Sequence, residues 1–173
     1  MNWNEYVSNI ELKLSKYFDI NRDVQFKTQQ INLFAKAEIH QEKFFGTKNV
    51  KIWSAKNYEY LFLQVIEEIS ETKIETFQKF LICMIDELVK PHSEHMSSTF
   101  TGILVVDHFP ASLEDQIKKF KYKKSFAFSL KGWADIRLLV IDLNSKRVIH
   151  NKKGKEVATF YQPMRTSLKF IQN

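Results

Sequence analysis

The alternation of hydrophobic and polar residues along the chain predicts helices that are separated by groups of strands. Between residues 3 and 18, apolar side chains recur at the spacing of one helical face, and Asn2 with Glu5 resembles a capping box. Residues 31–39 then alternate between apolar and polar, which is typical of a half-buried strand. In residues 24–26 the apolar side chains fall at even-numbered positions, whereas those of residues 31–39 fall at odd-numbered ones. We therefore expect a bulge or short turn near "KTQQ" between the two segments.

Two more strands are expected at residues 50–55 and 58–65. The polar pair at 56–57 predicts a tight turn between them, and Gly46 lies in the connection before the first. With the alternating segment that precedes them, these strands predict a meander of three strands, or four if residues 24–26 form a separate one.

A second amphipathic helix is predicted from residue 72 to residue 89. Thr72 and Glu75 form a capping-box pattern, and Pro91 follows the end of the helix. The apolar arc is wide, so we expect neighbours on more than one side of this helix. The run "TGILVVD" at 101–107 is continuously apolar, which is typical of a central strand.

The last third of the chain predicts shorter elements. "DHFPASLED" turns into a short helix with Ser112 and Asp115 as its cap, and "SFAFSL" alternates like a strand. "WADIRLLVIDL" is a long strand, and "NSKRVIHN" is a turn with a return strand. Pro163 divides the tail into two short pieces of helical character.

The predicted order is therefore α-βββ-α-β-α-ββ(β)-tail over residues 1–173. Helices that alternate with groups of strands indicate the α+β class, here with a mixed, mainly antiparallel sheet covered by helices. A chain of 173 residues without repeats or low-complexity linkers predicts a single domain with one core.

The amino-acid composition indicates a folded protein of the cytoplasm without a membrane span. The apolar fraction of 44% is that of a folded protein, and no apolar run approaches the roughly 18 residues of a membrane span. The first residues, "MNWNEYVSNI", have no basic segment followed by an apolar stretch, so no signal peptide is expected. Cys83 is the only cysteine, which excludes an internal disulfide and favours a reducing, cytoplasmic location.

The charge is distributed unevenly. The chain carries a net +6, yet residues 118–155 contain twelve Lys or Arg and two acids, a net +10. Residues 67–94 contain seven acids and three lysines. The basic segment indicates either a solvated surface or attraction of an anionic partner, namely nucleic acid or an acidic protein surface.

Two short stretches carry that basic charge. "KKFKYKK" interleaves lysines with aromatic residues, a composition that suits phosphate contacts and base stacking, and "NKKGK" has a glycine among lysines without the spacing of a Walker A loop. The alternative interpretation is a helix end and a turn. The candidate anion-binding residues are Lys118, Lys119, Lys121, Tyr122, Lys123, Lys124, Lys152, Lys153 and Lys155.

A second hypothesis concerns the strand "WADIRLLVIDL". Trp133, Asp135 and Arg137 share one strand face, opposite a wholly apolar face that must contact the core. Either the two charges satisfy each other, with Arg137 stacked on Trp133, or the three side chains line a groove.

A third hypothesis is a metal site. "PHSEH" places His92, Glu94 and His95 just after the long helix, and Asp107 with His108 follows the central strand. Imidazole and carboxylate groups are transition-metal ligands, but the spacing matches no established metal motif, and solvated turns have a similar composition. No motif requires a cofactor, and a divalent metal is the one candidate.

Two resemblances complete the sequence evidence. The order helix, three strands, helix, strand resembles the core of PD-(D/E)XK nucleases. However, "WSAKNYEYLFLQ" lacks their metal carboxylate and acid-x-Lys pattern, and Asp135-x-Arg137 has Arg for Lys on a later strand, so the activity is not carried over. "HMSSTFTG", "KGWADIRLLVIDL" and "NKKGKEVA" are similar to an uncharacterised bacterial protein family, a resemblance that implies no chemistry.

The sequence thus predicts a non-enzymatic binding or interaction protein whose basic C-terminal surface contacts nucleic acid or another anionic partner. The alternative is a metal-dependent hydrolase or nuclease that uses the His/Asp/Glu cluster. Both interpretations leave the ligand and the oligomeric state open.

Overall fold

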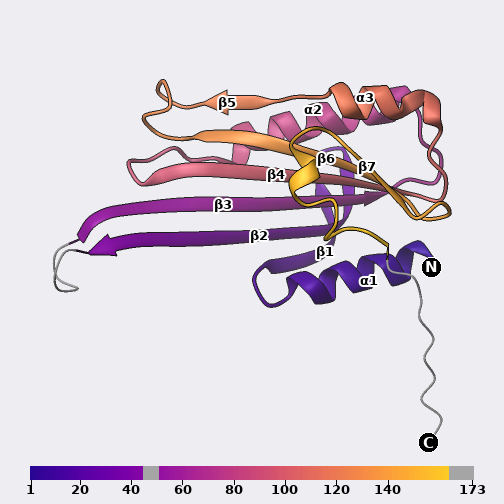
Figure 1. Cartoon of the computed structure of the whole chain (residues 1–173), viewed down its shortest axis with the longest axis horizontal. Coiled ribbons are helices and arrows are strands. Elements are labelled where there is room, and N and C mark those ends of the chain that lie inside the picture. Colours follow the sequence, from indigo (N-terminus) through magenta and orange to yellow (C-terminus); the bar gives the residue numbers. More distant parts are fainter. Residues whose placement is uncertain (45–50, 164–173) are drawn as a thin grey trace, which may run out of the picture.

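A computed structural model describes residues 1–44 and 51–163, with the side chains of 42–44 and 51–54 left out. The predictions for Gly46, for residue 50 and for the tail after Pro163 lie outside the described residues. Within them, three α-helices and a seven-stranded mixed sheet confirm the α+β class (Figure 1). No helix in these two ranges is long and apolar enough to cross a membrane.

The elements follow one another in nearly the predicted order. They are α1 (Trp3–Leu14), β1 (Asp19–Phe26), β2 (Gln29–Phe44), β3 (Lys51–Val65), α2 (Glu71–Leu88), β4 (His95–Val106), a 3-10 turn η1 (Ala111–Leu113), α3 (Glu114–Lys119), β5 (Lys123–Ser125), β6 (Trp133–Asp142), β7 (Arg147–His150) and a 3-10 turn η2 (Gly154–Glu156).

The strands lie in the order β1-β2-β3-β4-β6-β5, and β7 also pairs with β6. β1, β2 and β3 form an antiparallel meander, and β4 is parallel to both β3 and β6. β5 and β7 are antiparallel to β6. The sheet is therefore mixed and mainly antiparallel, and β4 is the central strand that its continuous apolar run predicts.

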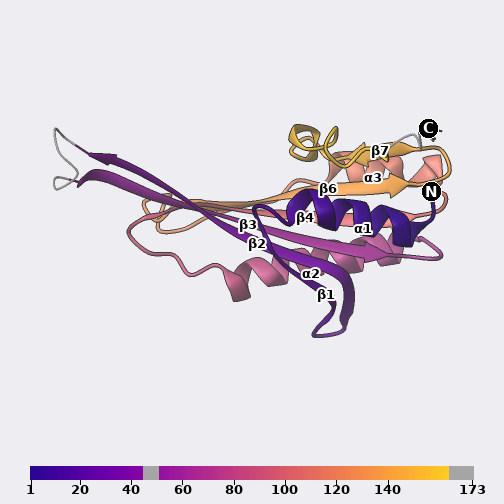
Figure 2. The same ribbon diagram turned by 90° about the horizontal axis from the view of Figure 1, so that it is seen from below.

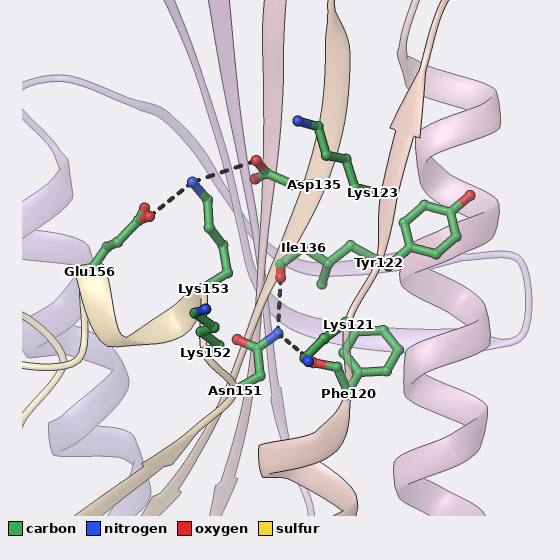
Figure 3. Close-up of a pocket in the computed structure, with 10 residues that line it drawn as sticks. All are labelled: Phe120, Lys121, Tyr122, Lys123, Asp135, Ile136, Asn151, Lys152, Lys153 and Glu156. Atoms are coloured by element: carbon green, nitrogen blue, oxygen red, sulfur yellow. Dashed lines mark hydrogen bonds and ion pairs between the residues drawn. The ribbon is translucent and has the colours of Figure 1, made fainter.

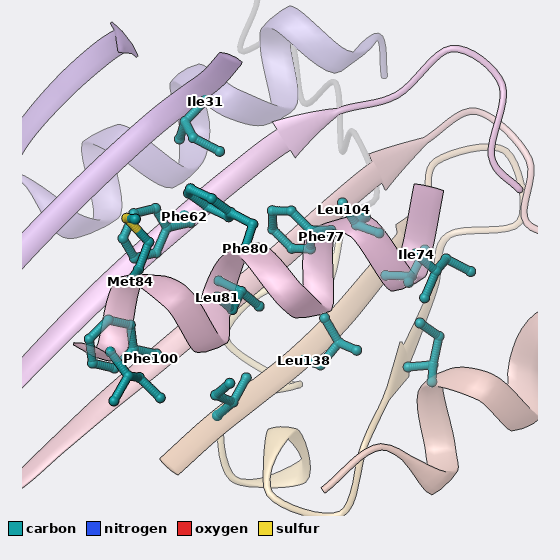
Figure 4. Close-up of a cluster of buried hydrophobic side chains, with 14 of the residues drawn as sticks. Ile31, Phe62, Ile74, Phe77, Phe80, Leu81, Met84, Phe100, Leu104 and Leu138 are labelled. Carbon is teal, nitrogen blue, oxygen red and sulfur yellow. The ribbon is translucent and has the colours of Figure 1, made fainter. Parts of the chain in front are cut away.

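Each face of the sheet has its own hydrophobic cluster (Figures 2 and 4). α2 and α3 cover one face, where four phenylalanines from β3, α2 and β4 are buried: Phe62, Phe77, Phe80 and Phe100. α1 covers the other face, together with Tyr161 from the C-terminal segment. Neighbouring residues of β4, Ile103 and Leu104, belong to opposite clusters, as the period of two in a strand requires.

The helix boundaries differ from the prediction at their caps. Asn2 accepts the backbone N–H of Glu5 at 2.8 Å, as predicted, but α1 ends at Leu14 because the chain turns there into β1. α2 is capped by Ser70 rather than Thr72. The predicted side-chain cap of the third helix is wrong: η1 leads directly into α3, and neither helix has a side-chain cap.

The predicted turn at Lys56–Asn57 is also wrong. β3 runs through both residues, which pair with His40 and Ile39 of β2 in a continuous ladder. Pairing with β4 begins at Lys56, with a register irregularity between Lys56 and Asn57. Ladder bonds to two neighbouring strands thus override the local turn preference of a Lys-Asn pair. The turn near "KTQQ" is confirmed, since Lys27 and Thr28 separate β1 from β2.

The strand predicted for "SFAFSL" is wrong as well. β6 begins at Trp133, which pairs with Ser125, so a strand beyond Ser125 would have no neighbour. The chain instead forms a hairpin loop with positive φ at Ala127, Phe128 and Ser129. Phe128 is fully exposed at the tip of this loop.

Two strands extend past the rest of the sheet. β1 pairs with β2 only as far as Lys36, and β4 begins opposite Lys56. Beyond Lys56, residues 51–55 of β3 pair only with residues 41–44 of β2, and Figure 1 shows them as a projecting two-stranded ribbon.

The outer edge of β6 is shared by two short strands with a gap between them. β5 pairs with residues 133–135 and β7 with residues 139–142. The Asn151 side chain fills this gap: its Oδ1 accepts the N–H of Leu138 at 3.1 Å, and its Nδ2 donates to the carbonyl of Ile136 at 3.1 Å. Nδ2 also donates to the carbonyl of Phe120 at 3.2 Å, which joins the segment before β5 to the segment after β7. One amide therefore satisfies buried backbone groups that would otherwise lack partners.

Replacing Asn151 with Ala should destabilise the fold. The change leaves the Leu138 N–H and the Ile136 carbonyl without partners inside the protein, which should lower the free energy of unfolding by about 2–4 kcal/mol. Urea denaturation followed by circular dichroism measures this loss. Asn21→Ala, at an exposed position on β1, is the control and should change stability by less than about 0.5 kcal/mol. A loss below about 1 kcal/mol for Asn151→Ala would contradict the role of the amide.

Candidate functional site

A cavity of about 640 Å³ opens beside the gap that Asn151 fills (Figure 3). Three segments line it: the end of α3 with the start of β5, the middle of β6, and the turn that follows β7. The lining residues are Phe120, Lys121, Tyr122, Lys123, Asp135, Ile136, Asn151, Lys152, Lys153 and Glu156. Six of these ten are candidate residues that the sequence singles out for the anion site or the groove, and we call this cavity the lysine pocket.

The turn after β7 is held tightly against β6. Asn151 accepts the backbone N–H of Gly154 at 2.7 Å through the same Oδ1 that bonds to β6. A Cβ atom at Gly154 would lie 3.0 Å from that oxygen and 3.0 Å from the carbonyl of Leu138, so a side chain there would push the turn away. The end of the same segment is fixed by Tyr6 of α1, whose hydroxyl donates to the carbonyl of Tyr161 at 2.8 Å. The pocket wall is thus anchored on both sides.

An ion-pair network forms one side of the pocket. Glu156 lies 2.9 Å from the ammonium of Lys153, and its Oε2 accepts from the Arg137 Nη2 at 3.1 Å. These two cations hold the pKa of Glu156 below its ordinary value, with Lys153 as the larger cause. In turn, the hydrogen bond to Glu156 raises the pKa of Lys153, so this lysine stays charged at neutral pH.

The predicted lysines fall into two groups. Lys118, Lys119 and Lys124 pair with Glu114, Asp115 and Asp86, which neutralises them at their own positions. By contrast, no described carboxylate lies within ion-pair distance of the ammonium groups of Lys121, Lys123, Lys152 or Lys155, and the first three of these line the pocket. The structure therefore concentrates free positive charge in the pocket rather than along a continuous strip.

The aromatic residues do not face the pocket as the sequence suggests. The ring of Tyr122 packs against the hydrophobic cluster below α2, and Figure 3 shows it pointing away from the lysines. The Trp133 ring, for which the sequence suggests stacking with Arg137, instead has the ammonium of Lys123 over it, 5.0 Å from its centroid.

Asp135 and Arg137 share the strand face that faces α1, but each has other partners. Arg137 lies 3.6 Å from Glu59 on β3 as well as bonding to Glu156. Asp135 lies 3.6 Å from Lys153, a distance too long for a hydrogen bond, and its other oxygen, Oδ1, is buried with no hydrogen-bond partner. Of the three groove residues, Asp135 is the one that lines the pocket.

The candidate metal ligands are divided between the two ends of β4. His92, Glu94 and His95 precede or begin this strand, whereas Asp107 and His108 follow it, roughly 40 Å away at the rise of an extended chain. His108 lies 4.0 Å from Asp142, and His92 lies 3.2 Å from the hydroxyl of Tyr58. Within residues 1–44 and 51–163, no three His, Cys, Asp or Glu side chains lie close enough together to hold a metal ion.

His95 is a buried structural residue. Its Nδ1 donates to the carbonyl of Lys131 at 2.6 Å, and its Nε2 lies 2.9 Å from the hydroxyl of Ser98. Both ring nitrogens are thus occupied, which connects the start of β4 to the loop before β6.

Sequence reasoning did not identify Asn151, Glu156, Phe120 or Ile136 as part of a site. The available signal was local: Asn151 follows an apolar strand and precedes Gly154 by three residues, a spacing that suits a side chain folding back onto its own turn. The bond from the Asn151 amide to β6 depends on tertiary structure and has no sequence signature.

Comparison with known proteins places most of the chain in one family. The family model described as Domain of unknown function (DUF8052) matches residues 2–163. No curated protein and no solved structure matches the chain.

Replacing His95 with Ala should destabilise the protein without affecting any metal. The two lost hydrogen bonds predict a decrease of about 1–3 kcal/mol in the free energy of unfolding. His108→Ala, whose side chain is exposed, should have little effect. Thermal denaturation of untagged protein, with and without micromolar Zn²⁺, tests both statements. A Zn²⁺-dependent increase in the Tm of the wild type that His95→Ala abolishes would contradict this account.

Proposed function

The chain belongs to the DUF8052 family, whose function is unknown, and from its geometry we propose that it is a non-enzymatic binding protein whose lysine pocket holds the phosphate group of an anionic ligand. This proposal refines the basic surface predicted from the sequence to a single concave site. The alternative of a metal-dependent hydrolase or nuclease needs a cluster of metal ligands, and none is found among the described residues.

The observation that carries the proposal is the distribution of unpaired charge. Residues 118–155 contain twelve basic side chains, and six of them pair with carboxylates: Lys118, Lys119, Lys124, Arg137, Arg147 and Lys153. Three of the remaining six, Lys121, Lys123 and Lys152, come from two separate segments and line the same cavity. Like charges held together without carboxylate partners repel one another, and an anion that enters between them relieves that repulsion.

The shape of the site favours a compact ligand. A volume of about 640 Å³ lies within the roughly 300–1,000 Å³ range of small-molecule pockets. A protein that binds along a duplex backbone needs several unpaired cations over an extended surface. Here the lysines of α3 are already neutralised, which supports a phosphorylated small molecule or the end of a nucleic acid strand over a long duplex.

A cytoplasmic setting and a bacterial origin belong to the same proposal. The first rests on the single, unpaired Cys83, because phosphorylated metabolites and reduced thiols are both abundant in a reducing compartment. The second rests on the sequence resemblance alone.

Changing both Lys121 and Lys152 to Ala should weaken the binding of inorganic pyrophosphate by about tenfold or more. Two ammonium groups that are free to contact phosphate are removed from the pocket, and each charge-assisted hydrogen bond contributes on the order of 1 kcal/mol or more. Isothermal titration calorimetry at low ionic strength measures the affinity, and adding salt should weaken it.

The control is Lys118→Ala with Lys119→Ala, which removes the same amount of charge from α3, outside the pocket. We expect this variant to bind pyrophosphate within about twofold of the wild type, since its lysines are already paired with Glu114 and Asp115. Equal losses in both double variants would indicate attraction by overall charge instead of a pocket. No binding by the wild type at low salt would refute the proposal. Displacement of a labelled single-stranded oligonucleotide by pyrophosphate would identify nucleic acid as one source of the phosphate.

A further inference from the structure

We propose that Asp135 binds a hydroxyl group of the ligand, so that the lysine pocket selects a phosphate ester of a sugar, such as a ribose phosphate, over phosphate itself. This inference rests on the proposed function, since the lysines must first attract the phosphate. It adds a specificity residue and a chemical class of ligand that the positive charge alone does not define.

The inference starts from an unsatisfied carboxylate. Asp135 is only 8% exposed, and its Oδ1 is buried without a hydrogen-bond partner. A carboxylate can accept several hydrogen bonds, and a buried one that accepts none loses its hydration without compensation. Such a group persists where something outside the protein supplies the donor, and Asp135 lines a cavity that opens to solvent.

The nearby cations do not compensate Asp135 fully. Lys153 is 3.6 Å from its Oδ2, whereas the same ammonium is 2.9 Å from Glu156 and therefore bonds to Glu156 in preference. Lys123 pairs with Asp135 in the β5–β6 register, yet its ammonium lies over the Trp133 ring. Figure 3 shows the carboxylate between Lys153 and Lys123, at the side of the cavity formed by β6.

A carboxylate beside a phosphate site favours a ligand that carries a hydroxyl group as well as a phosphate. A bare phosphate gains from the lysines but is repelled by Asp135, so the pocket is poorly matched to phosphate alone. A ligand that carries a hydroxyl next to its phosphate satisfies both: the phosphate contacts the lysines, and the hydroxyl donates to the Asp135 carboxylate. Sites built to bind a hydroxyl discriminate strongly against analogues that lack it, because the protein group is then left without a partner.

Ribose 5-phosphate and methyl phosphate are suitable probes, because both are phosphate monoesters of the same charge and only the first has hydroxyl groups. We expect the wild-type protein to bind ribose 5-phosphate at least tenfold more tightly than methyl phosphate in isothermal titration calorimetry. Asp135→Asn should reduce this ratio to about one to three, because the amide is a weaker acceptor than a carboxylate. Its affinity for methyl phosphate should stay equal or increase, because a negative charge has been removed.

The matched control is Glu59→Gln, which removes a carboxylate that contacts Arg137 on the same face of the sheet but does not line the pocket. It should keep the tenfold ratio. If both probes bind the wild type equally, or if Asp135→Asn keeps the ratio, this inference is wrong while the phosphate site stands. If neither probe binds, the proposed function fails as well. If Asp135→Asn does not fold, the test is the affinity of the wild type for ribose 5-phosphate relative to methyl phosphate. A preference of at least tenfold supports the inference, and equal affinities contradict it.

Discussion

The structure of the C-terminal half depends on one requirement, which is that the outer edge of β6 must have hydrogen-bond partners along its whole length. β5 and β7 each cover only part of that edge, because β5 is three residues long and β7 is four. The Asn151 side chain replaces the missing strand between them and bonds to the backbone of Ile136 and Leu138. The same amide bonds to Phe120 and Gly154, so it also brings the chain before β5 next to the turn after β7. The lysine pocket is a consequence of this arrangement, since its walls are these two segments.

Much of the fold could be predicted from hydrophobic patterns, because burial on one or two faces leaves a clear period in the sequence. The central position of β4 and the two faces of β6 both follow from such patterns, and the structure confirms them. The mistakes occurred where long-range pairing competes with local preference. Lys56 and Asn57 favour a turn in isolation, yet two neighbouring strands hold them extended. "SFAFSL" alternates like a strand, yet β6 is already at its end, and the segment forms a loop.

The site could be predicted only in part for a related physical reason. The sequence identifies the lysines but not their partners, because an ion pair such as Lys124 with Asp86 joins residues far apart in the chain. Once those pairs are known, three of the six basic side chains of residues 118–155 that remain unpaired line one cavity. Asp135 was notable in the sequence for the charge it places on an apolar strand. Only the structure shows that Asp135 has Lys153 at 3.6 Å as its ion-pair partner instead of Arg137, and that its Oδ1 is buried without a hydrogen-bond partner.

The most direct test of this account is to locate the bound ligand by NMR. Ribose 5-phosphate is titrated into ¹⁵N-labelled protein, and shifts of the backbone amides are followed. If the lysine pocket is the binding site, the largest changes will fall on residues 120–123, 135–136 and 151–156, with little change on α1 or on the exposed lysines of α3. Changes spread over all basic residues, or concentrated away from these three segments, would contradict the claim that Asn151 builds a phosphate site at the edge of β6.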